Sequence, residues 1–178
     1  MKIAAISGSL RKGSSNTAVL RAAARLAPPG VEVVLFDGIA GLPYFNPDLD
    51  GAEVPAAVTA FRTVIGSADG VLISSPEYAR GVAGVMKNAL DWLVASLEFP
   101  DKPVALINTS PRATHALAAL RLTLETMSAR IVDEACVTLP LLGTASGEDG
   151  VVGSNELAEP LREAMERFAA AVRPPQDA

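Results

Sequence analysis

One loop near the N-terminus carries groups suited to binding an anion. The segment Gly8–Thr17 reads GSLRKGSSNT and lies between a short apolar run and a helical pattern. Backbone N–H groups and the positive end of a helix dipole attract anions at such a junction. Arg11 adds a planar fork suited to phosphate oxygens. The neutral donors of the loop are Ser9, Ser15, Asn16 and Thr17. The pattern predicts a site for a phosphate monoester held without a metal.

The same loop has a purely structural interpretation. A serine or asparagine there would cap the following helix, and Arg11 and Lys12 would be solvated cations. The loop matches neither the G-x-x-x-x-G-K-[ST] motif of nucleotide hydrolases nor the G-x-G-x-x-G dinucleotide fingerprint.

A second loop, Ser74–Val82, carries an aromatic side chain at the end of an apolar run. Pro76, Glu77 and Tyr78 there combine an aromatic wall with backbone polar groups, which a flat heterocycle requires. The alternative is a proline turn with an exposed glutamate and a structural tyrosine. Lys87 and Asp91 follow at i and i+4, a spacing typical of a solvated ion pair.

A third loop, Asn108–His115, adds hydroxyl groups and an arginine. Ser110 is placed to contact the polar edge of a ring, and Arg112 to attract a phosphate of a second substrate. His115 is expected at the surface, near the start of a helix. Cys136 lies in an apolar segment that predicts a strand, where a buried, unreactive thiol is expected.

Composition excludes several classes of protein. The chain has 178 residues with one histidine, one cysteine and a net charge of −5. A single cysteine rules out a disulfide framework and a cysteine metal cluster, and the charge argues against nucleic-acid binding. A G-x-S-x-G elbow and a carboxylate pair at a strand end are both missing, so hydrolase and glycosidase chemistry fit poorly. A place for a phosphate and a ring without an acid–base pair is typical of a redox cofactor protein.

The elements that position these loops alternate along the chain. The predicted strands are Lys2–Ser7, Val31–Phe36, Gly70–Ser75, Pro103–Asn108 and Ile131–Leu139. The predicted helices are Asn16–Leu26, Pro55–Ile65, one with an apolar face from Val82 to Leu93, one from Leu117 to Met127, and one from Leu157 to Val172 capped by Ser154 or Asn155. This alternation predicts an α/β fold, a three-layer sandwich with a five-stranded parallel sheet. Ligands of such sheets bind at the carboxyl ends of the strands, where the three loops lie.

The chain is expected to form one domain over residues 1–178, with a frayed tail at 173–178. The N-terminus resembles no targeting segment, and no apolar run approaches the roughly 20 residues of a membrane helix. A cytoplasmic protein without membrane or nucleic-acid partners is therefore expected.

The sequence resembles the NADPH-dependent FMN reductase family, a flavodoxin-like group of chromate, quinone and azo-dye reductases. The motifs that carry the resemblance are Gly8-Ser9-Leu10-Arg11 with Ser15-Asn16, Ser75-Pro76-Glu77-Tyr78, and Lys87-Asn88-Ala89-Leu90-Asp91-Trp92. It implies noncovalent FMN, with NADPH or NADH as co-substrate. The phosphate would be held by Ser9, Arg11, Ser15, Asn16 and Thr17, and the isoalloxazine flanked by Pro76, Glu77, Tyr78, the backbone at Ala79 and Gly81, and Ser110.

The resemblance also bears on substrate and assembly. Arg80 and Arg112 would attract the phosphates of the nicotinamide nucleotide, and no side chain is assigned as catalytic. The helix Lys87–Trp92 would pack across a homodimer, or within a homotetramer, so that Trp92 and Leu93 would be interface rather than core. Ala79, Gly81 and Ala83 stand where many relatives have Asn, Ser and Pro, and Ser110–His115 replaces a glycine-rich run.

The predicted function is therefore an FMN-dependent NAD(P)H oxidoreductase. Hydride would pass through flavin N5 to a small acceptor: a quinone, an azo or nitro compound, a metal oxyanion or free flavin. One alternative is a non-enzymatic electron carrier of the flavodoxin type, and another is a phosphate-binding protein with no redox role. The low aromatic content near the loops and the expected dimer helix favour the reductase.

Overall fold

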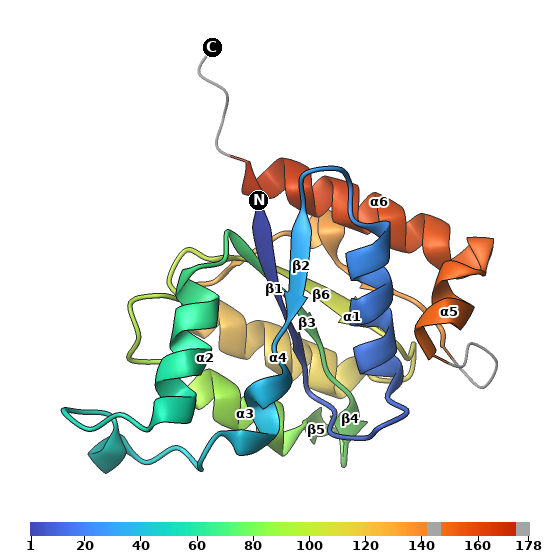
Figure 1. The fold of residues 1–178 in the computed structure, drawn as a ribbon. Helices are drawn as coiled ribbons and strands as arrows, with labels where there is room; N and C mark the ends of the chain where they lie inside the picture. The colour runs from blue at the N-terminus through green and yellow to red at the C-terminus, as the bar shows by residue number, and fades with distance from the viewer. Residues whose placement is uncertain (142–146, 174–178) are drawn as a thin grey trace.

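The computed structural model describes residues 1–141 and 147–173, so most of the tail expected to fray lies outside the described residues. Figure 1 shows strands and helices alternating along the chain, as the sequence predicts. The strands are β1 (Lys2–Ser7), β2 (Glu32–Leu35), β3 (Gly70–Ser74), β4 (Glu77–Tyr78), β5 (Gly81–Val82), β6 (Pro103–Asn108), β7 (Arg130–Ile131) and β8 (Val137–Thr138). The α-helices are α1 (Ser15–Leu26), α2 (Ala56–Gly66), α3 (Gly84–Asp91), α4 (Thr114–Thr126), α5 (Gly147–Val152) and α6 (Asn155–Val172). Short 3₁₀ helices occupy Asp37–Gly41, Pro47–Leu49 and Asp133–Ala135.

The central sheet is parallel, with the strand order β2-β1-β3-β6-β7 and β8 paired to β6. In register, Ser7 of β1 lies beside Ser74 of β3, so the loops that follow the two strands begin side by side. The chain proceeds outward in opposite directions from β1 and from β3, so the strand order reverses between these two strands. Sheets of this kind bind ligands at the carboxyl ends of the strands at such a reversal.

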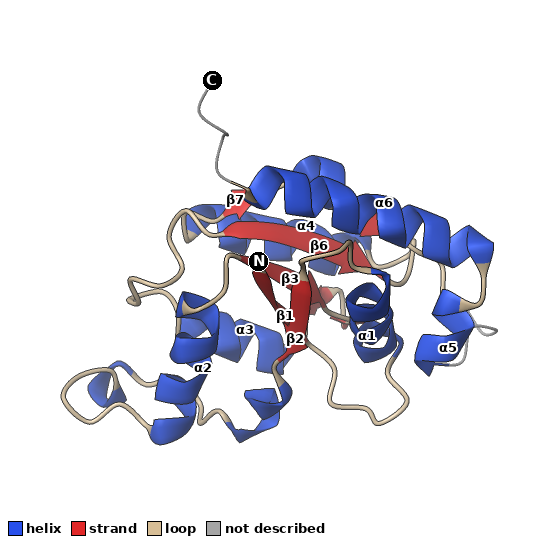
Figure 2. Ribbon diagram, turned by 45° about the horizontal axis from the view of Figure 1, so that its top comes forward, coloured by secondary structure: helices blue, strands red, loops and turns tan. Residues whose placement is uncertain are grey.

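Side chains of the inner strands alternate between two apolar clusters, one on each face of the sheet. In β1, Ala4 and Ile6 face one cluster and Ile3 and Ala5 the other. The first cluster takes residues from α2, α3 and α4, and the second from α1, α5 and α6. Figure 2 shows the helices on either side of the sheet. The three-layer α/β sandwich is confirmed, because strands buried on both faces need helices on both faces.

The prediction of one continuous fifth strand over Ile131–Leu139 is wrong. After β7 the chain turns through a 3₁₀ helix, with the Ala135 amide donating to the Val132 carbonyl at 3.0 Å, before β8 pairs with the other end of β6. Asp133 and Glu134, both exposed, occupy the interruption. Cys136 therefore lies between two short strands, partly buried, rather than within one strand.

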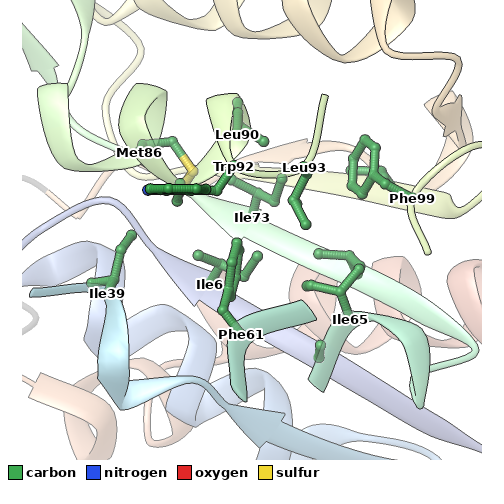
Figure 3. Close-up of a cluster of buried hydrophobic side chains, with 14 of the residues drawn as sticks. Ile6, Ile39, Phe61, Ile65, Ile73, Met86, Leu90, Trp92, Leu93 and Phe99 are labelled. Carbon is green, nitrogen blue, oxygen red and sulfur yellow. The ribbon is translucent and has the colours of Figure 1, made fainter. Parts of the chain in front are cut away.

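The expectation that Trp92 and Leu93 lie at a dimer interface is also wrong. The two side chains are 0% and 1% exposed within the single chain. Figure 3 shows them in the apolar cluster with Phe61, Met86 and other buried side chains. The indole Nε1 donates to the Pro43 carbonyl at 2.8 Å, so Trp92 anchors the segment that follows β2 as well as filling the core.

Two further expectations concern helix ends and surface charge. Ser154 precedes α6 at its N-cap position, as predicted, although its side chain makes no capping hydrogen bond. Lys87 and Asp91 form the expected solvent-accessible ion pair.

Among the described residues, no helix is long and apolar enough to cross a membrane.

Candidate functional site

The loop after β1 is organised by hydrogen bonds of its own hydroxyl groups. Ser14 is the N-cap of α1, and its Oγ accepts the Thr17 amide at 3.3 Å. The Thr17 hydroxyl pairs with the Ser7 hydroxyl at 2.8 Å, which ties the helix start to the end of β1. The first turn of α1 contains no acidic residue. The remaining free N–H groups and the helix dipole therefore face no negative charge from this turn.

A cavity of about 370 Å³ opens at this helix start. Among the described residues, three cationic side chains line it, those of Arg11, Lys12 and Arg21, with one acidic side chain, that of Glu148. The hydroxyl-bearing lining residues are Ser14, Ser15 and Thr17. Cations and hydroxyl donors around a helix N-terminus suit a phosphate group. We call this the anion cavity.

Gly8 allows the loop to lie directly against the end of β3. A Cβ atom at this position would sit 2.3 Å from the Ser75 hydroxyl oxygen and 2.8 Å from the Ser75 Cβ. The Gly8 amide instead donates to the Ser74 carbonyl at 2.8 Å. The absence of a side chain thus brings the loops after β1 and β3 together.

A buried network around Asn16 joins three elements. The Asn16 Oδ1 accepts hydrogen bonds from the hydroxyls of Ser74 at 2.9 Å and Thr109 at 3.3 Å. The three residues are 6%, 1% and 8% exposed. The network links α1 to the ends of β3 and β6, so the three loops are held in one arrangement.

A second cavity, of about 290 Å³, lies between the loops after β3 and β6. Its residues are Asn16, Ser75, Pro76, Glu77, Asn108, Thr109, Ser110, Arg112 and Ala113. Asn108 shapes the wall by accepting the Ser110 amide at 3.2 Å and donating to the Ser110 carbonyl at 2.7 Å. We call this the ring cavity, because oriented polar groups line it beside Pro76, a lining that suits a flat ligand.

The wall formed by Glu77–Val82 is a small antiparallel hairpin, β4 with β5, where the sequence predicts only a loop. Its two turn residues, Ala79 and Arg80, have φ angles of 49° and 59°. Left-handed backbone costs a residue with a Cβ about 1–2 kcal/mol, and such outliers cluster at functional sites. The hairpin is fastened to α4, because the Glu77 carboxylate accepts the Ala116 amide at 2.9 Å.

Comparison with known proteins identifies the family. A model of the NADPH-dependent FMN reductase family matches residues 1–141. The chain belongs to this family. It is 45% identical over 112 residues to an NAD(P)H-dependent FMN reductase of Pseudomonas aeruginosa, a match that covers 62% of this chain and 60% of the relative. A quinone reductase of Escherichia coli is 42% identical over 115 residues, with 62% and 60% covered.

Solved structures agree with this assignment. FerB, a flavoenzyme NAD(P)H:(acceptor) oxidoreductase from Paracoccus denitrificans, superposes with a TM-score of 0.78 at 30% identity, covering 96% of each chain. An NADH:FMN oxidoreductase in its apo form shares the fold, with a TM-score of 0.66 at 22% identity over 97% of this chain and 90% of that chain. This member of the FMN reductase family matches the curated relatives over less than two thirds of their length.

The structure of this family member divides the predicted phosphate residues between sites. Arg11, Ser15 and Thr17 line the anion cavity. Asn16 instead lines the ring cavity and holds the network described above. The Ser9 amide donates to the Ser7 hydroxyl at 3.3 Å.

The residues predicted for the ring and substrate are also divided. Pro76, Glu77, Ser110 and Arg112 line the ring cavity. Tyr78 lines a third cavity on the other side of the hairpin. Ala79 and Arg80 form the hairpin turn, and Gly81 begins β5.

Sequence reasoning missed several lining residues of this family member. They are Lys12, Ser14 and Arg21 in the anion cavity and Asn108 and Thr109 in the ring cavity. Ser14 carries a recognisable signal, because a serine three residues before Thr17 matches a helix cap. Arg21 lies at i+4 from Thr17, on the same helix face.

The remaining candidates for chemistry lie elsewhere. His115 is exposed at the start of α4, as expected. Burial raises the pKa of the Cys136 thiol, and the Leu106 amide and Arg121 oppose this shift. Hydrogen bonding to Asp133 raises the pKa of Arg121. Among the described residues, no three His, Cys, Asp or Glu side chains are grouped so as to hold a metal ion.

Proposed function

We propose that this protein is an FMN-dependent NAD(P)H oxidoreductase that passes hydride equivalents to a small acceptor. The observation that carries the proposal is the Asn16 network, which joins a cation-lined anion cavity to a crevice at the ends of β3 and β6. A phosphate ester attached to a flat ring system needs one compartment for the phosphate and a neighbouring one for the ring. Membership of the FMN reductase family supports the same cofactor.

The anion cavity fits the phosphate of FMN. Arg11 would supply charge-assisted hydrogen bonds, and the Ser15 and Thr17 side chains and the free N–H groups of α1 would complete the shell. Ser9 and Asn16 are proposed to contribute from the rim of this site. The Asn16 Oδ1 already accepts two hydrogen bonds, which leaves its Nδ2 group as the donor toward a ligand.

The ring cavity fits the isoalloxazine. Pro76, Glu77, the backbone of Ala79 and Gly81, and Ser110 would orient it, and Tyr78 would border it from the far side of the hairpin. When bound, FMN would supply the redox chemistry, the transfer of two electrons from NAD(P)H to the acceptor. The task of the chain is then to bind and orient, and no side chain is assigned as a general acid or base. Arg80 and Arg112 are proposed to attract the phosphates of the nicotinamide nucleotide.

The first experiment is a visible absorption spectrum of the purified protein after incubation with FMN and removal of unbound flavin. A retained flavin spectrum that bleaches with NADPH or NADH under anaerobic conditions is expected. Retention without bleaching by either nucleotide would favour an electron carrier of the flavodoxin type. A folded protein that retains no flavin would overturn the proposal and favour a phosphate site with no redox role.

We further propose that residues 1–178 form a single FMN-binding domain that assembles as a homodimer or homotetramer and works in the cytoplasm, where NAD(P)H is available. The basis for this assembly is the family resemblance; Leu97 and Leu122, 94% and 66% exposed, are single apolar side chains at the surface and do not by themselves indicate an interface. Light scattering coupled to size exclusion is expected to give a mass of two or four chains. A mass of one chain, 18.4 kDa, would overturn the assembly.

A further inference from the structure

A fourth cavity, of about 290 Å³, lies between helix α1, strand β2 and the first turn of α5. Figure 1 shows β2 and α5 on either side of α1. The residues that line the cavity are Leu20, Arg21, Ala24, Arg25, Val33, Leu35, Asp37 and Glu148. We call it the α1 groove. The proposed function assigns no ligand to it.

The α1 groove adjoins the anion cavity. Arg21 and Glu148 line both of them. Arg21 follows Thr17 by four residues, which places it about 6 Å further along the helix axis, at a rise of 1.5 Å per residue. A phosphate held at the start of α1 therefore has Arg21 one helical turn beyond it, at the boundary between the anion cavity and the groove.

The charges at this boundary leave one cation available to a ligand. Glu148 pairs with Arg25 at 3.3 Å, and Arg25 pairs with Asp149 at 2.6 Å. In the part of the chain that the structure describes, Arg21 forms no ion pair. Since Arg25 offsets the negative charge of Glu148, the Arg21 guanidinium can hold a second phosphate group next to the first.

The rest of the groove combines apolar walls with a carboxylate. Val33 and Leu35 are half-buried on one face of β2, and they lie beside the buried Leu20 of α1. Asp37 comes two residues after β2 and is exposed, with no ion pair to any other described residue. An apolar crevice beside a carboxylate suits a nucleoside, because the base packs against the apolar walls and the ribose hydroxyls donate to the carboxylate.

The position of Asp37 is the one that binds ribose in dinucleotide-binding α/β domains. In those domains the diphosphate lies at the start of the helix after the first strand, and an acidic side chain after the second strand accepts hydrogen bonds from the adenosine ribose. Here the anion cavity opens at the start of α1, and Asp37 follows β2. The loop after β1 lacks the glycine fingerprint of those domains, so the likeness is one of position alone.

We infer that the α1 groove binds the adenosine monophosphate part of FAD, so that the protein accepts FAD as well as FMN. This inference rests on the proposed function, because the flavin and its first phosphate occupy the ring cavity and the anion cavity. Arg21 would hold the second phosphate, Asp37 the ribose hydroxyls, and the apolar side chains of β2 the adenine.

NAD(P)H also carries adenosine, but the position of the groove favours FAD. The groove shares Arg21 and Glu148 with the anion cavity, whereas among the described residues it shares none with the ring cavity. A nicotinamide must reach the flavin ring to pass on its hydride. The groove therefore extends the site from the phosphate end of the flavin, where the second half of FAD begins.

Equilibrium dialysis of the flavin-free protein against FMN and against FAD tests this assignment. The wild-type Kd for FAD is expected to be no higher than the Kd for FMN. Asp37→Ala is expected to raise the Kd for FAD about tenfold, because hydrogen bonds to a charged group are lost, and to leave the Kd for FMN within twofold. Asp48→Ala is the matched control, since Asp48 is an exposed aspartate in another short 3₁₀ helix outside the groove lining.

A second measurement separates FAD from NAD(P)H as the source of the adenosine. In the FMN-loaded protein, Asp37→Ala is expected to leave the KM values for NADPH and NADH within twofold. A raised KM with an unchanged Kd for FAD would assign the groove to the nicotinamide nucleotide and overturn the inference. A wild-type Kd for FAD above that for FMN, or equal effects of Asp37→Ala on both flavins, would overturn it as well. A folded wild-type protein that binds neither flavin would instead overturn the proposed function, so the two failures are distinguishable.

Discussion

The carboxylate of Glu77 accepts the backbone amide of Ala116 at 2.9 Å across 39 residues of sequence. Ala116 lies in the first turn of α4, whose N-cap residue Ala113 offers no side-chain hydrogen bond. Glu77 therefore caps α4 from a different element, and its negative charge lies at the positive end of the helix dipole. This one hydrogen bond thus joins the β4–β5 hairpin, which contributes Glu77 to the ring cavity, to helix α4.

Glu77→Ala is expected to destabilise the fold by about 0.5–2 kcal/mol, the usual cost of losing an N-cap. The free energy of unfolding from urea titration measures this loss. Glu77→Gln keeps an oxygen acceptor and is expected to retain most of the stability. Equal stability of the alanine variant and the wild-type protein would show that the contact is not formed in solution.

Arg11→Ala is expected to weaken FMN binding by about 1.5–3 kcal/mol, a rise in Kd of roughly 10- to 150-fold, because a charge-assisted hydrogen bond to the phosphate is lost. Fluorescence titration of the apoprotein with FMN measures it. Arg167→Ala is the control, since Arg167 is an exposed arginine paired with Glu163 outside the cavities described. An unchanged Kd in Arg11→Ala would remove Arg11 from the phosphate site.

Asn16→Ala is expected to cost about 1–3 kcal/mol of folding stability, because the buried hydroxyls of Ser74 and Thr109 lose their shared acceptor. FMN affinity is expected to fall as well, since this network joins the two cavities. Asn155→Ala, at an exposed asparagine, provides the comparison. A stability loss no larger than in that control would contradict the role assigned to the network.

Arg80→Gly is expected to stabilise the protein by up to about 1 kcal/mol. Glycine adopts the left-handed backbone conformation of this turn position, where φ is 59°, without steric strain. The greater entropy of the unfolded chain with glycine offsets part of this gain. Arg80→Ala removes the same side chain but keeps a Cβ, so it is expected to give no gain. Denaturant unfolding of the two variants separates strain from charge, and equal stabilities would contradict the strain argument.

The thiol of Cys136 is expected to react slowly. Burial raises its pKa above 9.0, so reaction with a disulfide reagent at pH 8 is expected to be at least about tenfold slower than that of a free thiol. Denaturant should restore the ordinary rate. Above pH 9.0 the unfolded thiol ionises before the folded one, so the contribution of Cys136 to stability falls as pH rises. A native rate equal to the denatured one would contradict the burial of the thiol.

The sequence by itself determined the alternation of strands and helices and the edge of the sheet at which the three polar loops meet. The apolar runs Lys2–Ser7 and Pro103–Asn108 are strands with the predicted bounds, because strands buried on both faces leave a continuous apolar signal. Strand ends in a parallel sheet converge, so the three polar loops could be assigned to one edge. The motifs in these loops were enough to indicate the family.

Only the tertiary structure decided how those loop residues are used. Side chains such as those of Asn16 and Glu77 can bind a ligand or form hydrogen bonds within the protein. In the structure both accept hydrogen bonds from groups that lie 39 to 93 residues away in the sequence. The family resemblance of the Lys87–Trp92 helix placed Trp92 at an interface rather than in the core. In the structure it is buried in the apolar cluster, and its indole donates to the carbonyl of Pro43, 49 residues away. Such contacts form when distant segments of the chain pack together, so the local pattern of residue types does not predict them.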